Sequence, residues 1–307
     1  MRLEVKSDYR KASKPGAIGE DAICKNEDAS MFAVCDGVDG PYSPSNPRHP
    51  YGKRTGGQMV GEIVKFVVEN AAESCNLYDT LLLANSLMGV CHESHKKSLA
   101  NEAVAGACVA ACQVKVDTVS LVLVGDCFAF WCDETGMNVA TNFDQSAFDF
   151  EQKGDEAFRQ CVEVVDQRFP ETKGKNLGRA WDEFFPRFGE KQFFRANRNL
   201  GNGGHAMLNG DPDLPRCWTT KEIPLVGLQW MLFCTDGLLP PHLMVPMHHD
   251  ILKNGVQWVF ERLALEGLGV WRDKMVAEHE AEVKGSDTPH IEGHPEGSVL
   301  AIRFLRG

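Results

Sequence analysis

The sequence predicts an α+β fold with a mostly antiparallel sheet system, and three observations support this. Apolar segments of strand length come in two batches, each followed by segments with helical periodicity. Turn signals such as Asp133-Glu134-Thr135-Gly136 join neighbouring segments, which favours hairpins. No repeat, linker or low-complexity segment divides the 307 residues. We therefore expect a single domain over residues 1–307 with a sizeable core.

The first batch of strands occupies the first forty residues. We expect a strand that opens at Leu3–Val5, and two more at Ala22–Lys25 and Met31–Cys35, which flank the turn signal Asn26-Glu27-Asp28. Apolar residues then recur at three-to-four spacing from Val60 to Ala71, which is typical of a helix with one buried face. A second helix is predicted over Leu77–Lys97.

The second batch begins near residue 103. Strands are predicted at Ala103–Cys112, Val119–Val124, Phe128–Cys132, Met137–Ala140, His205–Leu208, Cys217–Ile223, Gln229–Cys234 and Ser298–Phe304. Residues 148–190 have a mostly helical pattern with a loop at Glu171–Lys175, and helical patterns return over residues 254–283.

Composition excludes several classes of protein. The net charge of −11 argues against duplex nucleic acid as a partner, because binding it requires a clustered positive surface. The 11 cysteines include no CxxC pair and lack close paired spacing, which predicts free thiols in a reduced, cytoplasmic protein. The charged N-terminus has no signal-peptide pattern, and the apolar run Leu121–Trp131 is too short to cross a membrane.

Three apolar strands end in an aspartate, and this recurrence is the main functional signal. Asp36, Asp126 and Asp236 each follow a predicted buried strand, and a fourth acidic pair, Glu20-Asp21, begins the strand before Asp36. An Asp-Gly after a strand is most often a turn, and this interpretation holds for any one motif alone. Three such motifs together with an acidic pair favour a shared acidic site.

Such a site has a clear chemical use. Crowded carboxylates repel one another, and a hard divalent cation such as Mg²⁺ or Mn²⁺ removes that repulsion. Pairs of cations about 3.5–4 Å apart are used to hydrolyse phosphoesters. Gly37 and Gly237 follow two of the aspartates, and a glycine lets a backbone carbonyl approach a metal. Sequence spacing alone does not bring these strand ends together.

The order of these motifs resembles the metal-dependent protein phosphatases of type 2C, in particular their bacterial members. The resemblance covers about 290 residues. Its four main motifs are GEDA at Gly19–Ala22, AVCDGVDG at Ala33–Gly40, LVLVGDCFAFW ending at Trp131, and LFCTDGL at Leu232–Leu238. Two further segments match, NGGHAMLNGDP at Asn202–Pro212 and the closing SVLAIRF.

The resemblance implies a fold and a set of roles. The fold is a sandwich of two antiparallel sheets flanked by helices on both faces, in four α-β-β-α layers. Asp36 and Asp236 become catalytic carboxylates, with Asp36 bridging two Mn²⁺ or Mg²⁺ ions. Glu20, Asp21 and the Gly37 carbonyl serve one metal, Asp236 serves the other, and Asp126 helps to bind a weaker third ion. A metal-bridging water attacks a phosphomonoester, with phosphoserine or phosphothreonine in a protein as the expected substrate.

This sequence departs from the family pattern at two important places. Pro295 stands where the family has a metal-ligating aspartate, three residues before Ser298, and the nearby Glu296, His294, Glu292 or Asp287 are candidate replacements. The expected phosphate-binding arginine before the acidic pair is missing, and Lys14 is the candidate in its place. These departures keep a second hypothesis open, a relative with weak or no activity that binds a phosphopeptide or partner.

A third hypothesis is a metallophosphatase for a small phosphorylated molecule. Other polar groups have simpler interpretations: His92 and His95 are expected on a solvated helix surface, and His248-His249-Asp250 in a loop or helix start. Arg195 and Arg198 are expected to pair with surface acids, with phosphate contact as the alternative. The sequence does not indicate the oligomeric state.

Overall fold

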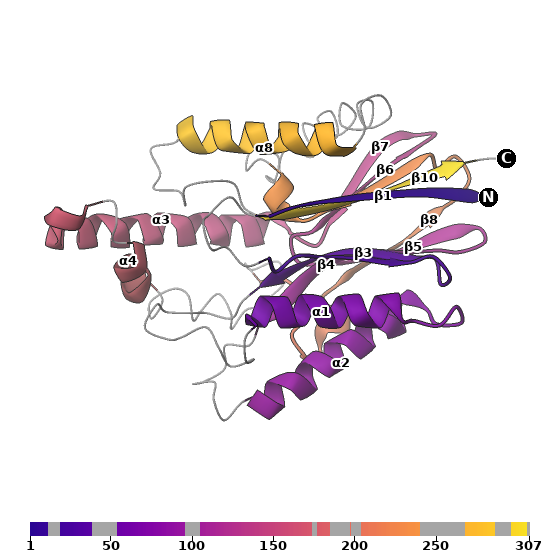
Figure 1. Ribbon diagram of the computed structural model, residues 1–307, viewed down its shortest axis with the longest axis horizontal. Coiled ribbons are helices and arrows are strands. Elements are labelled where there is room, and N and C mark those ends of the chain that lie inside the picture. The colour runs from indigo at the N-terminus through magenta and orange to yellow at the C-terminus, as the bar shows by residue number, and fades with distance from the viewer. Residues whose placement is uncertain are drawn as a thin grey trace.

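The computed structural model is a sandwich of two antiparallel five-stranded sheets with helices on both outer faces (Figure 1). This confirms the predicted α+β class and the four-layer arrangement. The structure describes residues 1–11, 19–38, 54–95, 105–173, 177–184, 197, 204–239, 268–285 and 296–305.

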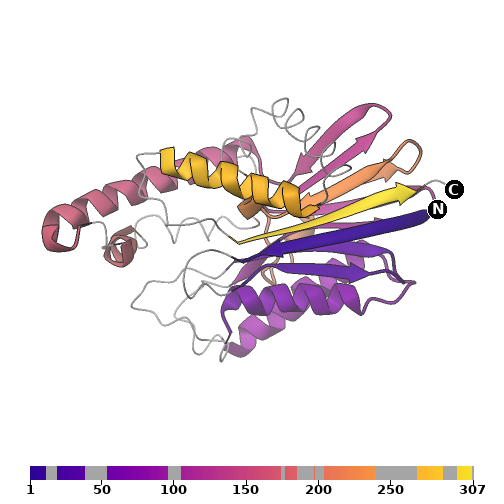
Figure 2. The same cartoon turned by 45° about the horizontal axis from the view of Figure 1, so that its top comes forward.

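The two sheets draw their strands from both halves of the chain. The first sheet has the order β1-β10-β9-β6-β7, with bounds Arg2–Arg10, Gly297–Leu305, Trp230–Cys234, Phe128–Asp133 and Gly136–Thr141. The second has the order β2-β3-β4-β5-β8, with bounds Ala22–Asn26, Met31–Val38, Gly106–Val114, Thr118–Val124 and Thr219–Pro224. Because β1 pairs with β10, the two ends of the chain lie side by side (Figure 2).

Helices complete the outer layers. The helices α1 (Gly56–Glu69) and α2 (Leu77–His95) cover the second sheet, and α8 (Leu268–Gly285) covers the first (Figure 2). The pair α3 (Gln145–Arg168) and α4 (Leu177–Phe184) extends beyond the end of the sandwich and has its own small apolar cluster (Figure 1). Short 3₁₀ turns are η1 (Pro170–Thr172), η3 (Leu214–Arg216) and η4 (Asp236–Leu238).

Both faces of the central strands are buried, which explains their continuous apolar runs. On β3, Phe32 and Val34 point into the core between the sheets, while Ala33 and Cys35 point into the core beneath α1 and α2. This alternation is the two-residue period of a strand packed on both sides. The strand ends are therefore fixed by two cores, and residues that follow them have well-defined positions.

The strand predicted to open at Leu3–Val5 is β1. Two details differ from the sequence predictions. The segment His205–Leu208 is not a strand, and its Leu208 makes an isolated bridge with Ala107. His92 is 3% exposed and not on a solvated surface, because it follows Met88 by four residues on the buried face of α2.

All eleven cysteines are free thiols, as predicted, and seven of them are buried in the three sandwich cores. Buried cysteines of this kind behave as small apolar side chains. Among the helices that the structure describes, none is both long and apolar enough to cross a membrane.

Candidate metal centre

Four aspartates come from the ends of strands in both sheets. Asp36 lies near the end of β3, and Asp21 directly precedes β2, whose Ala22 pairs with Cys35. Asp126 follows β5 after the turn residue Gly125, which has a φ of 71°. Asp236 follows β9 of the other sheet and opens η4. The site therefore lies where the two sheets end together.

The four carboxyl groups interact with one another. Asp36 experiences the charges of Asp21, Asp236 and Asp126, so the four carboxyl groups lie close enough to repel one another. The structure thus brings together Asp21, Asp36, Asp126 and Asp236, which spacing in the sequence could not do.

Burial and mutual repulsion change the acidity of this cluster. Burial raises the pKa of Asp36, and the charges of Asp21, Asp236 and Asp126 raise it further. Burial also raises the pKa of Asp21, as does the charge of Glu296. For Asp126, burial and the charge of Asp236 raise the pKa from 3.8 to about 7. Without a cation, burial and repulsion therefore favour the protonated forms of Asp21, Asp36 and Asp126.

The donor set fits a hard divalent cation, which would take the place of those protons. All four side chains offer carboxylate oxygens, the ligands that Mg²⁺ and Mn²⁺ prefer. Among the described residues, the buried Oδ1 of Asp126 has no hydrogen-bond partner, so it is available to a cation. No three His, Cys, Asp or Glu side chains in the described part of the chain already surround one point as formed metal ligands.

Thr235 connects the acidic cluster to both sheets. Its hydroxyl group donates to Oδ2 of Asp21 at 2.9 Å and accepts from the backbone N–H of Ser298 at 2.9 Å. Thr235 and Ser298 are both completely buried. In the sequence, Thr235 is the residue before Asp236 in the LFCTDGL segment, and no pattern there marks it as part of the site. Its role depends on a contact with a residue 214 positions earlier in the chain.

Two predicted metal ligands lie against the first turn of α1. A Cβ built on Gly57 would come within 2.8 Å of the Glu20 carboxyl group and within 2.6 Å of the Gly37 carbonyl oxygen. The Glu20 carboxyl group and the Gly37 carbonyl therefore both pack on the helix N-terminus, where negative charge is favourable. Only a glycine at position 57 permits this close approach.

Glu296 lies next to the acidic segment Glu20–Asp21, and both of its carboxylate oxygens already accept hydrogen bonds. Its Oε2 accepts from the backbone N–H of Glu20 at 2.8 Å, and its Oε1 accepts from the backbone N–H of Asp21 at 3.0 Å. The hydroxyl group of Tyr9 also donates to Oε1, at 2.5 Å. Sequence reasoning considered Glu296 only as a replacement metal ligand, and it did not identify Tyr9.

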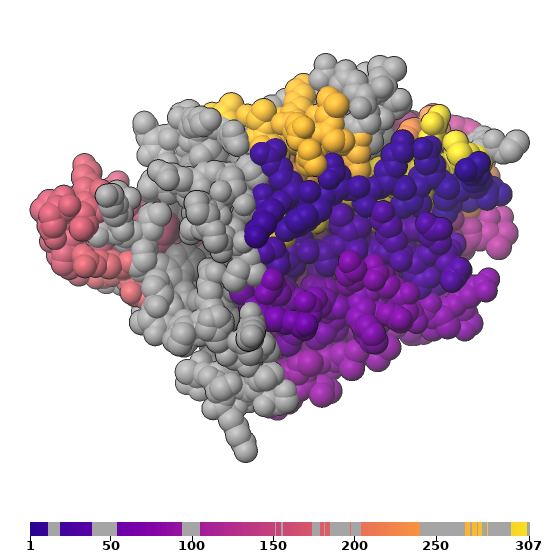
Figure 3. Space-filling view, in the orientation of Figure 1, coloured from indigo at the N-terminus to yellow at the C-terminus, as the bar shows by residue number. Residues whose placement is uncertain are grey.

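A cavity of about 400 Å³ opens beside these residues, between β1 and α1. Figure 3 shows this face, on which the N-terminal strands lie between α8 and α1. The cavity wall includes Tyr9, Glu20 and Asp21 on one side and Gln58, Glu62 and Lys65 of α1 on the other.

Several residues singled out from the sequence lie outside the described residues. They are Lys14, Arg195, Arg198, His248, His249, Asp250, Asp287, Glu292, His294 and Pro295. Their roles stay predictions.

Comparisons with known proteins place the fold among bacterial phosphatases. No protein-family model matches the chain, and no curated protein sequence matches it. Among solved structures, the serine/threonine phosphatase Stp1 from Staphylococcus aureus is 13% identical with a TM-score of 0.54, over 100% of this chain and 96% of that one. The catalytic domain of the serine/threonine protein phosphatase PstP, in complex with two manganese ions, is 15% identical with a TM-score of 0.52, over 99% of both chains.

PppA from Pseudomonas aeruginosa, a regulatory component of its type VI secretion system, gives a third comparison, at 13% identity and a TM-score of 0.50 over 99% of both chains. At these identities the likeness shows the fold. It agrees with the sandwich of two five-stranded sheets described above, and the sequence resemblance predicted the same fold.

Proposed function

We propose that this chain, which has the fold of the type 2C phosphatases, is a metal-dependent phosphatase for phosphoserine or phosphothreonine in proteins. One observation carries the proposal: four aspartates from the ends of strands in two sheets meet at one site, on a fold that it shares with a manganese-containing phosphatase. Its eleven free thiols suit a reducing compartment such as the cytoplasm.

Asp36 and Asp236 are the best candidates to hold two divalent cations between them. Asp21 and Asp126 extend the same set, and Glu20 and the Gly37 carbonyl lie at its border with α1. When bound, Mn²⁺ or Mg²⁺ neutralises this crowded charge and makes a water molecule acidic enough to attack phosphorus at neutral pH. The proposal includes two cations, and it extends to a third, more weakly bound cation at Asp126.

The protein residues have separate tasks in this scheme. Asp36 experiences the charges of both Asp21 and Asp236, which suits a carboxylate shared by two cations. Thr235 fixes the Asp21 carboxylate through its hydroxyl group, so that this ligand does not have to be ordered on binding. The neighbouring cavity of about 400 Å³ offers room for a phosphorylated side chain next to Asp21.

Phosphate release from a phosphoserine peptide tests the proposal. With added Mn²⁺ the purified chain should release phosphate, EDTA should stop the reaction, and Asp36→Asn should remove it. Asp28→Asn, in the exposed turn between β2 and β3, is the matched control and should stay active. Absence of turnover with Mn²⁺ and Mg²⁺ across a broad pH range contradicts the proposal.

Glu296 and Pro295 keep a second function in view, a non-catalytic protein that binds a phosphopeptide or partner. Pro295 has no side-chain oxygen, and both Glu296 oxygens already accept hydrogen bonds. If the chain binds the peptide with Mn²⁺ but releases no phosphate, this second function is correct. Faster turnover of small phosphoesters than of peptides would instead indicate a phosphatase for small molecules.

A further inference from the structure

We propose that Glu296 is a positioning residue that holds the Glu20–Asp21 segment in place through its backbone, and that Tyr9 supports it. Glu296 thus orients Asp21 toward the acidic cluster without itself binding a cation. The inference rests on the proposed metal site, and it deepens it by giving Glu296 a role different from that of a replacement ligand.

The hydrogen bonds of Glu296 define this role. Its two carboxylate oxygens accept three donors: the N–H groups of Glu20 and Asp21, at 2.8 and 3.0 Å, and the hydroxyl group of Tyr9 at 2.5 Å. A carboxylate is an acceptor only, so three converging donors match it. A glutamine would turn an N–H₂ group toward at least one of these donors.

The position of Glu296 in the fold gives these bonds their effect. Glu296 directly precedes β10 of the first sheet, while Glu20 and Asp21 directly precede β2 of the second. The Asp21 side chain is held separately by Thr235, which follows β9. The residue before β10 therefore fixes the backbone of Asp21. The residue after β9, the neighbouring strand of the same sheet, fixes the Asp21 carboxylate.

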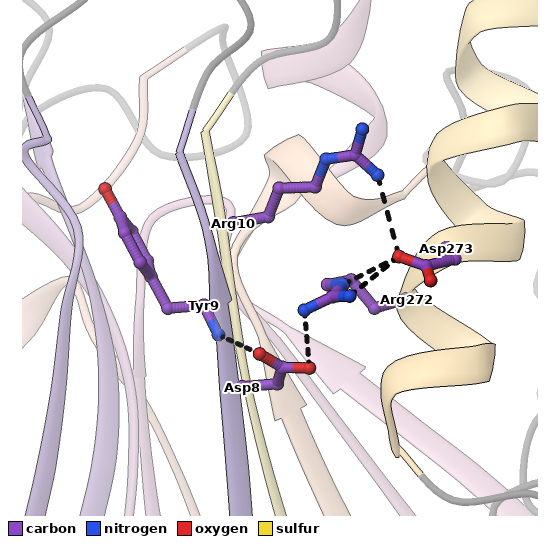
Figure 4. Close-up of polar contacts among 5 residues, drawn as sticks. All are labelled: Asp8, Tyr9, Arg10, Arg272 and Asp273. Carbon is purple, nitrogen blue, oxygen red and sulfur yellow. Dashed lines mark hydrogen bonds and ion pairs between the residues drawn. The ribbon is translucent and has the colours of Figure 1, made fainter.

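Tyr9 is oriented for this task by β1. Figure 4 shows that the Tyr9 side chain points to the opposite side of the strand from Asp8 and Arg10. Arg272 of α8 binds Asp8 at 2.7 Å, and this ion pair ties β1 to the helix on that other side. Since successive side chains alternate along a strand, fixing Asp8 turns Tyr9 toward Glu296.

The space around the segment leaves little freedom for another arrangement. A Cβ on Gly19 would clash with the Tyr9 hydroxyl group and lie 3.2 Å from the Glu296 Oε1. A Cβ on Gly61 of α1 would meet the Glu20 carbonyl oxygen at 2.7 Å. The acidic segment is thus enclosed between Tyr9 and Glu296 on one side and α1 on the other.

Amide hydrogen exchange and Mn²⁺ calorimetry test the proposal with Glu296→Gln, Tyr9→Phe and the control Glu4→Gln. Glu4 is on the same strand as Tyr9, and its carboxyl group pairs with Lys6 at 3.0 Å. Glu296→Gln should speed exchange at residues 20 and 21 and weaken Mn²⁺ binding about tenfold or more, as loss of an outer-shell partner does. Tyr9→Phe should weaken binding by a smaller factor, and Glu4→Gln should change neither.

The sign of the Tyr9→Phe effect separates positioning from direct ligation. If Glu296 were itself a metal ligand, the Tyr9 hydroxyl would compete for it, and Tyr9→Phe would tighten Mn²⁺ binding. That result, or unchanged exchange at residues 20 and 21 in Glu296→Gln, overturns the proposal. Because neither measurement needs turnover, a wild-type chain without phosphatase activity would refute the proposed function and leave this inference standing.

Discussion

Replacing Asp126 by asparagine should stabilise the metal-free protein, and the gain should depend on pH. The pKa of Asp126 lies at about 7 in the folded chain and at 3.8 as its ordinary value. Its cause is burial, followed by the charge of Asp236. When folding raises the pKa of an acid, ionisation of that acid costs more free energy in the folded state than in the unfolded state. The folded state therefore loses stability as pH rises from about 4 to about 7.

The difference of the two pKa values sets the magnitude. About three pH units, each worth about 1.36 kcal/mol, give about 4 kcal/mol as the full penalty above pH 7. Since the neighbouring carboxyl groups share the repulsion, protonation of one relieves the others, and we expect a gain of about 2–4 kcal/mol for Asp126→Asn at pH 8. At about 2 °C for each kcal/mol in a chain of this size, the melting temperature rises by about 4–8 °C.

Urea unfolding in EDTA at pH 8 and pH 4.5 measures this gain. At pH 4.5 the wild-type carboxyl group is protonated in the folded state and mostly ionised in the unfolded one, so the gain should fall to about 1 kcal/mol. Asp28→Asn, on an exposed turn, should be neutral at both pH values. An equal gain at both pH values, or none at pH 8, would refute the assigned repulsion. Mn²⁺ should reduce the difference in unfolding free energy between Asp126→Asn and the wild type, because a cation that binds only the folded state stabilises the wild type.

Two further substitutions test the packing of the site. Gly57→Ala places a methyl group 2.6 Å from the Gly37 carbonyl oxygen and should cost about 1–3 kcal/mol, whereas Gly269→Ala, at the start of α8 with 3.7 Å to its nearest neighbour, should be neutral or stabilising. Thr235→Val should cost about 1–3 kcal/mol, because it leaves the buried N–H of Ser298 without its acceptor, and Thr235→Ser should restore most of the loss. Chemical unfolding of each pair measures both effects, and equal stabilities within a pair would show that the contact is unimportant.

The sequence predicted the sheets and the aspartates well because both depend on local pattern. Buried strands have continuous apolar runs, and a strand that ends in aspartate leaves a readable signature at Asp36, Asp126 and Asp236. The same locality explains a failure at His205–Leu208, whose apolar residues are buried by neighbours without forming a ladder. His92 was misjudged because its polarity outweighed its place on the apolar face of α2.

The supporting residues of the site could not be predicted, because their partners are distant in sequence. Thr235 bonds to Asp21 across 214 positions, and Glu296 bonds to Glu20 across 276. Neither contact leaves a periodic pattern or a fixed spacing. The one sequence signal for Glu296 was its position two residues before Ser298, at the start of a strand. That position suggested a metal ligand as readily as a positioning residue.

Anomalous X-ray diffraction from crystals grown with Mn²⁺ tests the central claim most directly. We predict two anomalous peaks about 3.5–4 Å apart, with the Asp36 carboxylate between them and Asp236 at one of them. Asp36 oxygens should lie within about 2.0–2.6 Å of the ions. Peaks that lie away from these aspartates would contradict the account.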